Sequence, residues 1–164
     1  MIRLPVVAVI GLLAMLPAAA CDRGVDVTKA FEVTDVHTGW YDAGIVEGQK
    51  NKIVPSISIR LRNRSSDTVA SVQLNAVFRQ VNDKAAWGEH FAKAVGPDGL
   101  AVGATTNPIV LRSNLGYTSA DQTRLQMLRN SQFVDAKVEV YGKHGSRNWV
   151  KLGEYKIARQ LLTQ

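Results

Sequence analysis

The sequence contains one cysteine, Cys21, among 164 residues, and one long apolar run, from about Leu4 to Leu16. A single cysteine cannot form an internal disulfide, so in a secreted chain the thiol requires another explanation. The apolar run is shorter than the roughly 20 residues that a membrane-spanning helix needs. No later segment approaches that length, which argues against a protein that crosses a membrane several times through helices.

Motifs for catalysis and metal binding are also missing. The three histidines, His37, His90 and His144, lack the spacing of a metal site. No Gly-x-Ser-x-Gly is present, and the glycines of "GPDGLAVG" are not followed by the Lys-Ser or Lys-Thr of a phosphate-binding loop. Asp42 and Glu47 flank a predicted turn without a third calcium ligand at a regular offset. We therefore expect no catalytic residue, no metal and no enzymatic activity.

Residues 1–20 have the layout of a secretory signal peptide. Arg3 precedes the apolar run, and Pro17 and three alanines follow it. A buried N-terminal helix is the alternative, but no polar residues are interleaved to give it a surface face. Cleavage by the general signal peptidase would leave a soluble periplasmic protein with a free Cys21.

The segment "LPAAAC", Leu16 to Cys21, resembles the lipobox of bacterial lipoproteins. The resemblance implies that Cys21 becomes the mature N-terminus and carries a diacylglycerol and a further acyl chain such as palmitate, with no other cofactor. Two or three acyl chains would hold the protein on its membrane, because one chain alone binds only marginally. Ala18 departs from the commonest pattern, which has Leu there. Asp22 resembles an inner-membrane retention signal whose meaning varies between bacterial groups, so the choice of inner or outer membrane stays open.

Removal of residues 1–20 leaves 144 residues, the size of one domain, and lowers the net charge from +6 to +5 because Arg3 is lost. The polar residues after Cys21 predict a tether over 21–30, with the domain over 31–164. A basic balance suits anionic lipid headgroups, lipopolysaccharide or other acidic polymers. The expected compartment argues against nucleic acid as a partner.

Alternation of apolar and polar residues predicts the fold class. "KIVPSISIRLRN" places the apolar residues from Ile53 to Leu61 on one parity, as in a half-buried strand. The same pattern predicts strands near residues 31–37, 72–79, 87–91, 109–111, 134–140 and 149–157. Ser119 and Gln122 have the spacing of a helix cap, for one helix to about Arg129. We expect a mainly β fold, an antiparallel immunoglobulin-like β-sandwich of about seven strands with one short helix, or alternatively a small barrel.

The order "LRNRSSDTV", "VQLNAVFRQV", a loop and "GLAVGATT" resembles the immunoglobulin-like domains of bacterial envelope lipoproteins of the FxLYD type. The motif that gives that family its name is absent. The resemblance therefore implies an architecture and no function.

Two groups of residues are candidate binding surfaces. Cations share one parity along the predicted strand over 53–61, and a further arginine is expected near them across the sheet: Lys50, Lys52, Arg60, Arg62, Arg64 and Arg79. They would bind an anionic surface, or simply solvate the outer face of a sheet. Trp40 and Tyr41 are expected in a loop between strands, where they would contact a partner or pack over the rim of the core.

These observations predict a lipid-anchored lipoprotein of the bacterial envelope that faces the periplasm and acts by binding. We expect a binding or assembly module for other envelope components, with membrane lipid held through Cys21 and an envelope protein as partners. The alternative is a periplasmic protein that binds a small ligand or an anionic polymer.

Overall fold

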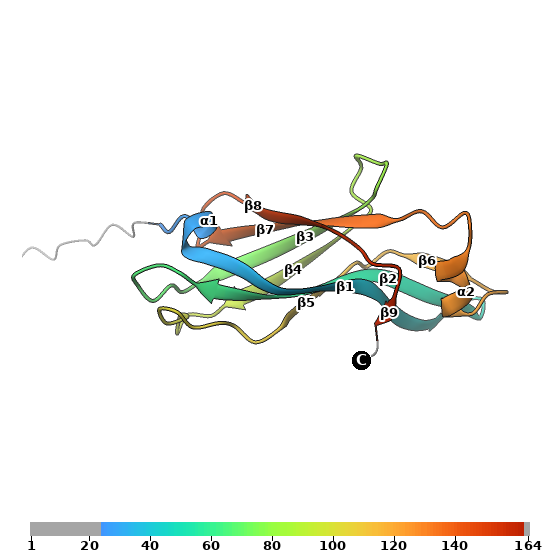
Figure 1. Cartoon of the computed structure of the whole chain (residues 1–164), viewed down its shortest axis with the longest axis horizontal. Helices are drawn as coiled ribbons and strands as arrows, with labels where there is room; N and C mark the ends of the chain where they lie inside the picture. Colours follow the sequence, from blue (N-terminus) through green and yellow to red (C-terminus); the bar gives the residue numbers. More distant parts are fainter. Residues whose placement is uncertain (1–23, 163–164) are drawn as a thin grey trace, which may run out of the picture.

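The computed structural model describes residues 24–162, which fold as two β-sheets packed face to face (Figure 1). The predicted signal peptide over 1–20 and the predicted lipid attachment site, Cys21, lie outside the described residues. The first sheet has the order β5–β2–β1–β9, with β6 also paired to β2, and the second has the order β4–β3–β7–β8. The first contains β1 (Phe31–Val46), β2 (Lys50–Asn63), β5 (Ile109–Arg112), β6 (Tyr117–Ser119) and β9 (Leu161–Leu162). The second contains β3 (Val72–Gln80), β4 (Gly88–Val95), β7 (Ala136–His144) and β8 (Val150–Lys156).

The strand order is that of an immunoglobulin-like sandwich, and the prediction of that fold class is confirmed. After the β1–β2 hairpin the chain crosses to the second sheet for β3 and β4, returns to pair β5 with β2, and crosses again for the β7–β8 hairpin. Every pair is antiparallel except β1 with β9. The described residues contain nine strands and two helices, against the expected seven and one.

The alternation in β2 correctly predicts the core. Ile53, Ile57, Ile59 and Leu61 have no exposed surface, and they face apolar residues of the second sheet that are equally buried. The facing residues are Val72, Leu74, Ala76 and Phe78 from β3, with Ala136, Val138 and Val140 from β7. Each fully buried large side chain contributes about 1.5–3 kcal/mol relative to exposure, so these three strands supply much of the stability of the fold.

Strand β1 is longer than the expected 31–37. The register with β2 shifts between Thr34 and His37 and again between Asp42 and Ile45, and the strand continues past both irregularities to Val46. Asp35 has a φ of 50° at the first shift. A β-bulge inserts an unpaired residue and reverses the parity that follows it, so the alternation that would mark a long strand is lost from the sequence.

The predicted tether over 21–30 is wrong in its second half. Val27 and Ala30 lie in helix α1 (Val27–Ala30) and are 2% and 4% exposed, packed against the core. Asp26 caps this helix by accepting a hydrogen bond from the backbone N–H of Thr28. The segment is polar in overall composition, but Val27 and Ala30 pack against the core and hold it to the sandwich.

Helix α2 (Arg124–Arg129) lies at the opposite end of the sandwich from α1 (Figure 1). Its cap is Thr123, in a capping box with Gln126, and not the predicted Ser119. The Ser119 hydroxyl accepts a hydrogen bond from the Gln122 N–H at 3.1 Å, which is a local turn before the helix. No helix within residues 24–162 has the length and apolarity required to cross a bilayer.

Candidate functional site

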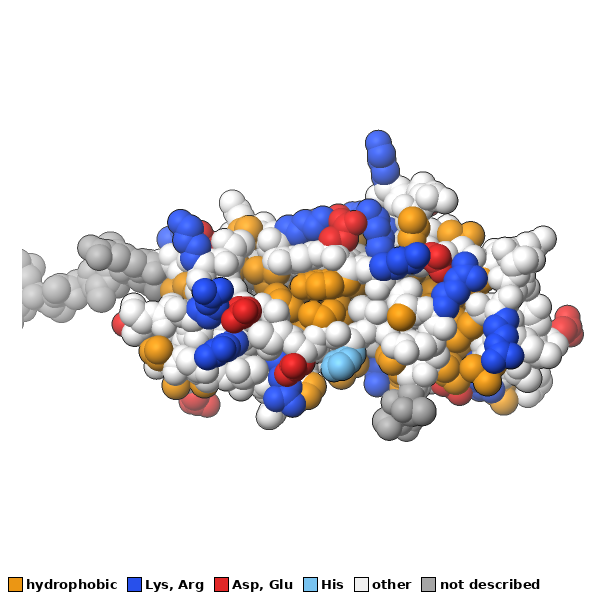
Figure 2. All heavy atoms as spheres, in the orientation of Figure 1, with side chains coloured by type: hydrophobic (Ala, Val, Ile, Leu, Met, Phe, Trp, Pro, Cys, Tyr) orange, Lys and Arg blue, Asp and Glu red, His pale blue; other side chains and the backbone are white. Residues whose placement is uncertain are grey.

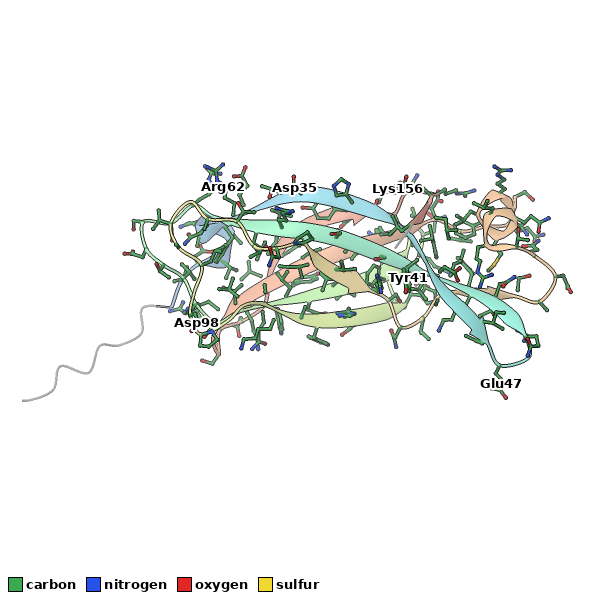
Figure 3. The ribbon with its side chains drawn as sticks, turned by 90° about the horizontal axis from the view of Figure 1, so that it is seen from below. Asp35, Tyr41, Glu47, Arg62, Asp98 and Lys156 are labelled. Carbon is green, nitrogen blue, oxygen red and sulfur yellow. The ribbon has the colours of Figure 1, made fainter. Side chains whose placement is uncertain are left out.

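The cations of β2 form two groups instead of one stripe. Lys50 and Lys52 lie near the start of β2, and about 27 Å separates Lys52 from Arg60 at the usual rise of a strand. Val54 and Ser56 between them are 4% and 1% exposed, because neighbouring side chains cover this part of the outer face. Figure 3 shows Arg62 toward the α1 end of the molecule and Glu47 in the β1–β2 hairpin at the other end.

The group at the α1 end, Arg60, Arg62 and Arg64, is called here the arginine group. Arg60 forms an ion pair with Asp35 at 3.4 Å, in which both side chains are well exposed. Arg62 and Arg64 are exposed and form no ion pair with any carboxylate in residues 24–162. Two exposed, unpaired guanidinium groups are therefore available on the outer face of the first sheet.

Arg79 does not belong to this surface. It lies on β3 in the second sheet, where its Nε donates a hydrogen bond to Glu139 Oε2 at 3.0 Å. The expectation that it lies near the arginines of β2 is wrong because the chain crosses between the sheets after β2 instead of forming a hairpin. The Arg79 side chain is 22% exposed and its charge is already neutralised.

Arg79 is part of an ion-pair network on the outer face of the second sheet. Lys151 Nζ lies 2.9 Å from Glu139 Oε1 and 2.6 Å from Glu154 Oε2, and Lys137 Nζ lies 3.2 Å from Glu154 Oε1. The hydrogen bond from Lys151, opposed by burial and assisted by Arg79, lowers the pKa of Glu139 to about 2. On this half of the outer face of the second sheet, the cations and carboxylates of the network therefore neutralise one another.

Trp40 is a core residue and cannot contact a partner, which corrects the expectation that it lies in a loop. It lies in β1, has no exposed surface, and packs edge-on against Phe133 with ring centroids 4.8 Å apart. Trp87 and Tyr117 complete this aromatic cluster at 6.1 and 5.6 Å from Trp40. The Trp40 Nε1–H is buried and has no hydrogen-bond partner among residues 24–162.

Tyr41 lies on the other face of the same strand, beneath a cation that the sequence did not indicate. The guanidinium carbon of Arg112, on β5, lies 3.5 Å from the centre of the Tyr41 ring. Arg112 is the Cα partner of Ser56 in the β2–β5 pair, so its side chain helps to cover the middle of β2. Tyr41 is half-buried in this contact.

The second sheet carries an aromatic pair, an exposed Phe91 and a half-buried Trp149, that sequence analysis missed. Phe91, on β4, is 61% exposed, and its ring centre lies 5.9 Å from that of Trp149, just before β8. Lys143 Nζ lies 4.8 Å from the Trp149 ring. We name Phe91, Trp149, Lys93 and Lys143 the aromatic–lysine patch. A depression of about 450 Å³ runs along β3 and β4 beside Phe91 and Lys93.

Beneath this patch lies a polar side chain, Asn75, that does not make all of its possible hydrogen bonds within residues 24–162. Asn75 is the Cα partner of Phe91 in the β3–β4 pair, and its Oδ1 is buried with no hydrogen-bond partner in the part of the chain that the structure describes. The signal in the sequence was the parity of β4, where the small residues Ala92 and Ala94 face inward and leave Phe91 and Lys93 outside. The contact between Phe91 and Trp149 could not be predicted without the strand order of the second sheet.

Within residues 24–162 no group of three His, Cys, Asp or Glu side chains is placed to hold a metal ion. No protein-family model matches the chain, and no curated protein and no solved structure matches it significantly.

Proposed function

We propose that this chain is a bacterial envelope lipoprotein, anchored through acyl chains on Cys21, whose β-sandwich faces the periplasm and binds other envelope components. The position of the only cysteine directly after an apolar segment supports the anchor. The domain then acts as a binding or assembly module at a membrane surface.

The closely packed core is the observation that supports binding at the outer surface of the domain. The largest inward side chains of both sheets, among them Phe78, Ile57 and Leu74, are fully buried and in contact with one another. A carrier that held a ligand between its sheets would need a cavity of a few hundred Å³ lined by such residues. With the space between the sheets filled by side chains, binding takes place on the outer faces.

The arginine group is the surface best suited to an acidic partner. Figure 2 shows lysine and arginine side chains along the molecule, outnumbering the carboxylates on the visible face. Arg62 and Arg64, two residues apart in the chain, have no carboxylate partner in the part of the chain that the structure describes. Guanidinium groups bind carboxylates and phosphates through paired hydrogen bonds, so an acidic protein surface would fit them.

An anionic polymer is the second candidate, and the spacing of the same arginines favours it. Arg60 and Arg62 are alternate residues of β2, which places them about 6.6–6.8 Å apart, a distance that suits successive charged groups of a polymer. A polymer would bind with a steep dependence on salt, because long-range attraction between exposed charges is screened within about 8 Å at physiological ionic strength. A protein partner held by packed contacts would depend on salt less.

Intact mass of the native protein from the membrane fraction tests the anchor. The expected mass exceeds that of bare residues 21–164 by a diacylglycerol and an acyl chain, and the Cys21→Ala protein lacks this increment. A native protein with the mass of the bare polypeptide, removed from vesicles by buffer alone, would contradict the proposal.

Crosslinking and pull-down from the same membranes test the binding surface. The R62E/R64E variant is expected to lose its crosslinked partners, because it reverses the two unpaired charges. The matched K50E/K52E variant changes the same charge at the far end of β2 and should retain them. Equal recovery of partners with both variants would exclude the arginine group.

A further inference from the structure

The N-terminal segment leaves the domain beside the β7–β8 turn. The Val25 N–H donates a hydrogen bond to His144 Nδ1 at 3.4 Å, and Val27 is buried in the core. Gly24 lies so close to the Arg147 side chain that a Cβ on Gly24 would overlap it. Arg147 is two residues before Trp149, so the chain departs next to the aromatic–lysine patch.

The distance from this exit to the anchor is short. Cys21 is three residues before Gly24, and an extended chain covers at most about 3.3–3.6 Å per residue, or about 11 Å in all. This step depends on the proposed acylation of Cys21. With lipid on that residue, the membrane surface lies within about 11 Å of the β7–β8 turn.

The patch beside the exit differs in charge from the rest of the same face. Arg79, Lys137 and Lys151 each form an ion pair with a carboxylate of the network around Glu139 and Glu154. Lys93 and Lys143, nearer the α1 end, form no ion pair within residues 24–162. The uncompensated positive charge on this face is therefore located where the chain leaves, and the exposed Glu89 of β4 is its unpaired carboxylate within residues 24–162.

The aromatic side chains of the patch suit the boundary between water and lipid. Phe91 is a large apolar side chain left 61% exposed, and it contacts Trp149 rather than the core. Tryptophan is enriched at membrane interfaces because its ring combines an apolar body with a polar N–H. Lysine beside it is attracted to anionic headgroups.

We propose that the aromatic–lysine patch docks on the anionic headgroup surface of the membrane that holds the Cys21 anchor. In this arrangement the domain contacts the bilayer through the outer face of the second sheet, at the end near α1. The outer face of the first sheet, with the arginine group, lies on the other side of the sandwich and stays open to partners.

Lipid quenching of Trp149 tests this docking. The acylated protein is reconstituted into vesicles of phosphatidylethanolamine and phosphatidylglycerol that include a brominated phospholipid. Trp40 is buried and Trp87 packs against it and Tyr117, whereas the half-buried Trp149 lies in the proposed docking patch, so we expect most of the quenching to come from Trp149 and to be lost in the W149F variant. Quenching should fall by about half or more in K93E/K143E and in high salt, since both remove attraction to anionic headgroups.

A matched variant and a folding check make the result interpretable. K50E/K84E makes the same change of charge at two exposed lysines away from the α1 end, and it should be quenched as strongly as wild type. Circular dichroism and the urea midpoint of K93E/K143E should match those of wild type.

The outcomes separate this inference from the proposed function. An acylated, vesicle-bound protein whose Trp149 is not quenched would overturn the docking and leave the anchor intact. A native chain without lipid would overturn both. Shielding of Trp149 that requires an added envelope protein would assign the patch to a protein interface and also overturn the docking.

Discussion

Arg79 Nε donates a hydrogen bond to Glu139 Oε2 at 3.0 Å across the β3–β7 pair. Lys151 approaches the other oxygen of the same carboxylate at 2.9 Å, so both oxygens of Glu139 face cations. The Glu139 side chain is only 14% exposed, which limits competition from water. The arrangement lowers its pKa to about 2, and the network depends on this ionised carboxylate.

Glu139 should therefore make unfolding depend on pH. Its folded pKa of about 2 lies below the ordinary 4.5, so its contribution is complete above pH 4.5 and is lost as the pH falls toward 2. We expect E139Q to lower the free energy of unfolding by about 1–2 kcal/mol at neutral pH and to flatten the dependence between about pH 5 and 2. Urea unfolding across this range measures both effects. E89Q, at an exposed carboxylate of β4, is the control, and an unchanged pH slope in E139Q would refute the assignment.

Trp40 should be among the costliest residues to truncate. Trp40→Ala removes a fully buried ring from a cluster with Phe133, Tyr117 and Trp87, and we expect a loss of about 3–5 kcal/mol. Trp40→Phe should cost less, because it also removes the unpartnered indole N–H. Urea denaturation followed by circular dichroism measures the differences. Trp149→Ala, at a half-buried position on the outer face of the second sheet, should cost clearly less than Trp40→Ala, and a similar loss in both variants would contradict this assignment of the core.

Strong alternation is what made the fold predictable from the sequence. The inward residues of β2, β3 and β7 are continuous over several positions, and all three strands and the sandwich follow from them. Alternation specifies the two faces of a strand but not the sheet to which it belongs. Arg79 was therefore assigned to the wrong sheet, although its strand was correctly predicted.

The candidate surfaces were less predictable because they depend on long-range contacts. Phe91 and Trp149 are far apart in the sequence and meet only because β4 and β8 flank the same two strands. The sequence predicts a loop at Trp40 because the bulge near Asp35 interrupts the alternation that would place this residue in a strand. Such contacts are fixed by tertiary packing and leave no periodic signal in the chain.

The cap of α2 gives a direct test of one corrected prediction. Thr123 accepts from the Gln126 N–H, and the Gln126 side chain accepts from the Thr123 N–H at 2.8 Å. Thr123→Ala should lower the free energy of unfolding by about 1 kcal/mol, because it leaves a helix N–H without its partner. Ser119→Ala, which removes only a turn contact, should cost less. If Ser119→Ala proved the costlier of the two in urea unfolding, the original assignment of the cap would be restored.

Asn63, at the end of β2, should be essential for joining two loops at the α1 end. It is fully buried, and its Nδ2 donates to the carbonyl oxygens of Asp67 and Leu100, both at 2.8 Å. Asn63→Ala removes these two hydrogen bonds and the two that Asn63 Oδ1 accepts from Ser65, and we expect a loss of about 2–3 kcal/mol, although each carbonyl keeps a second donor. Asn107→Ala, at an exposed loop position, should leave the urea midpoint unchanged.

The N63D variant separates the hydrogen bonds of Asn63 from its volume. A carboxylate of the same shape would keep the hydrogen bonds from Ser65 at one oxygen, but its other oxygen would face two carbonyl oxygens that repel it, so with burial we expect its pKa to rise above the unfolded value. N63D should therefore be less stable than N63A at neutral pH. It should recover part of the loss as the pH falls below about 4, where the carboxyl becomes protonated and can donate to one carbonyl. A urea midpoint of N63D with the same pH dependence as that of N63A would show that the two carbonyls do not constrain this position.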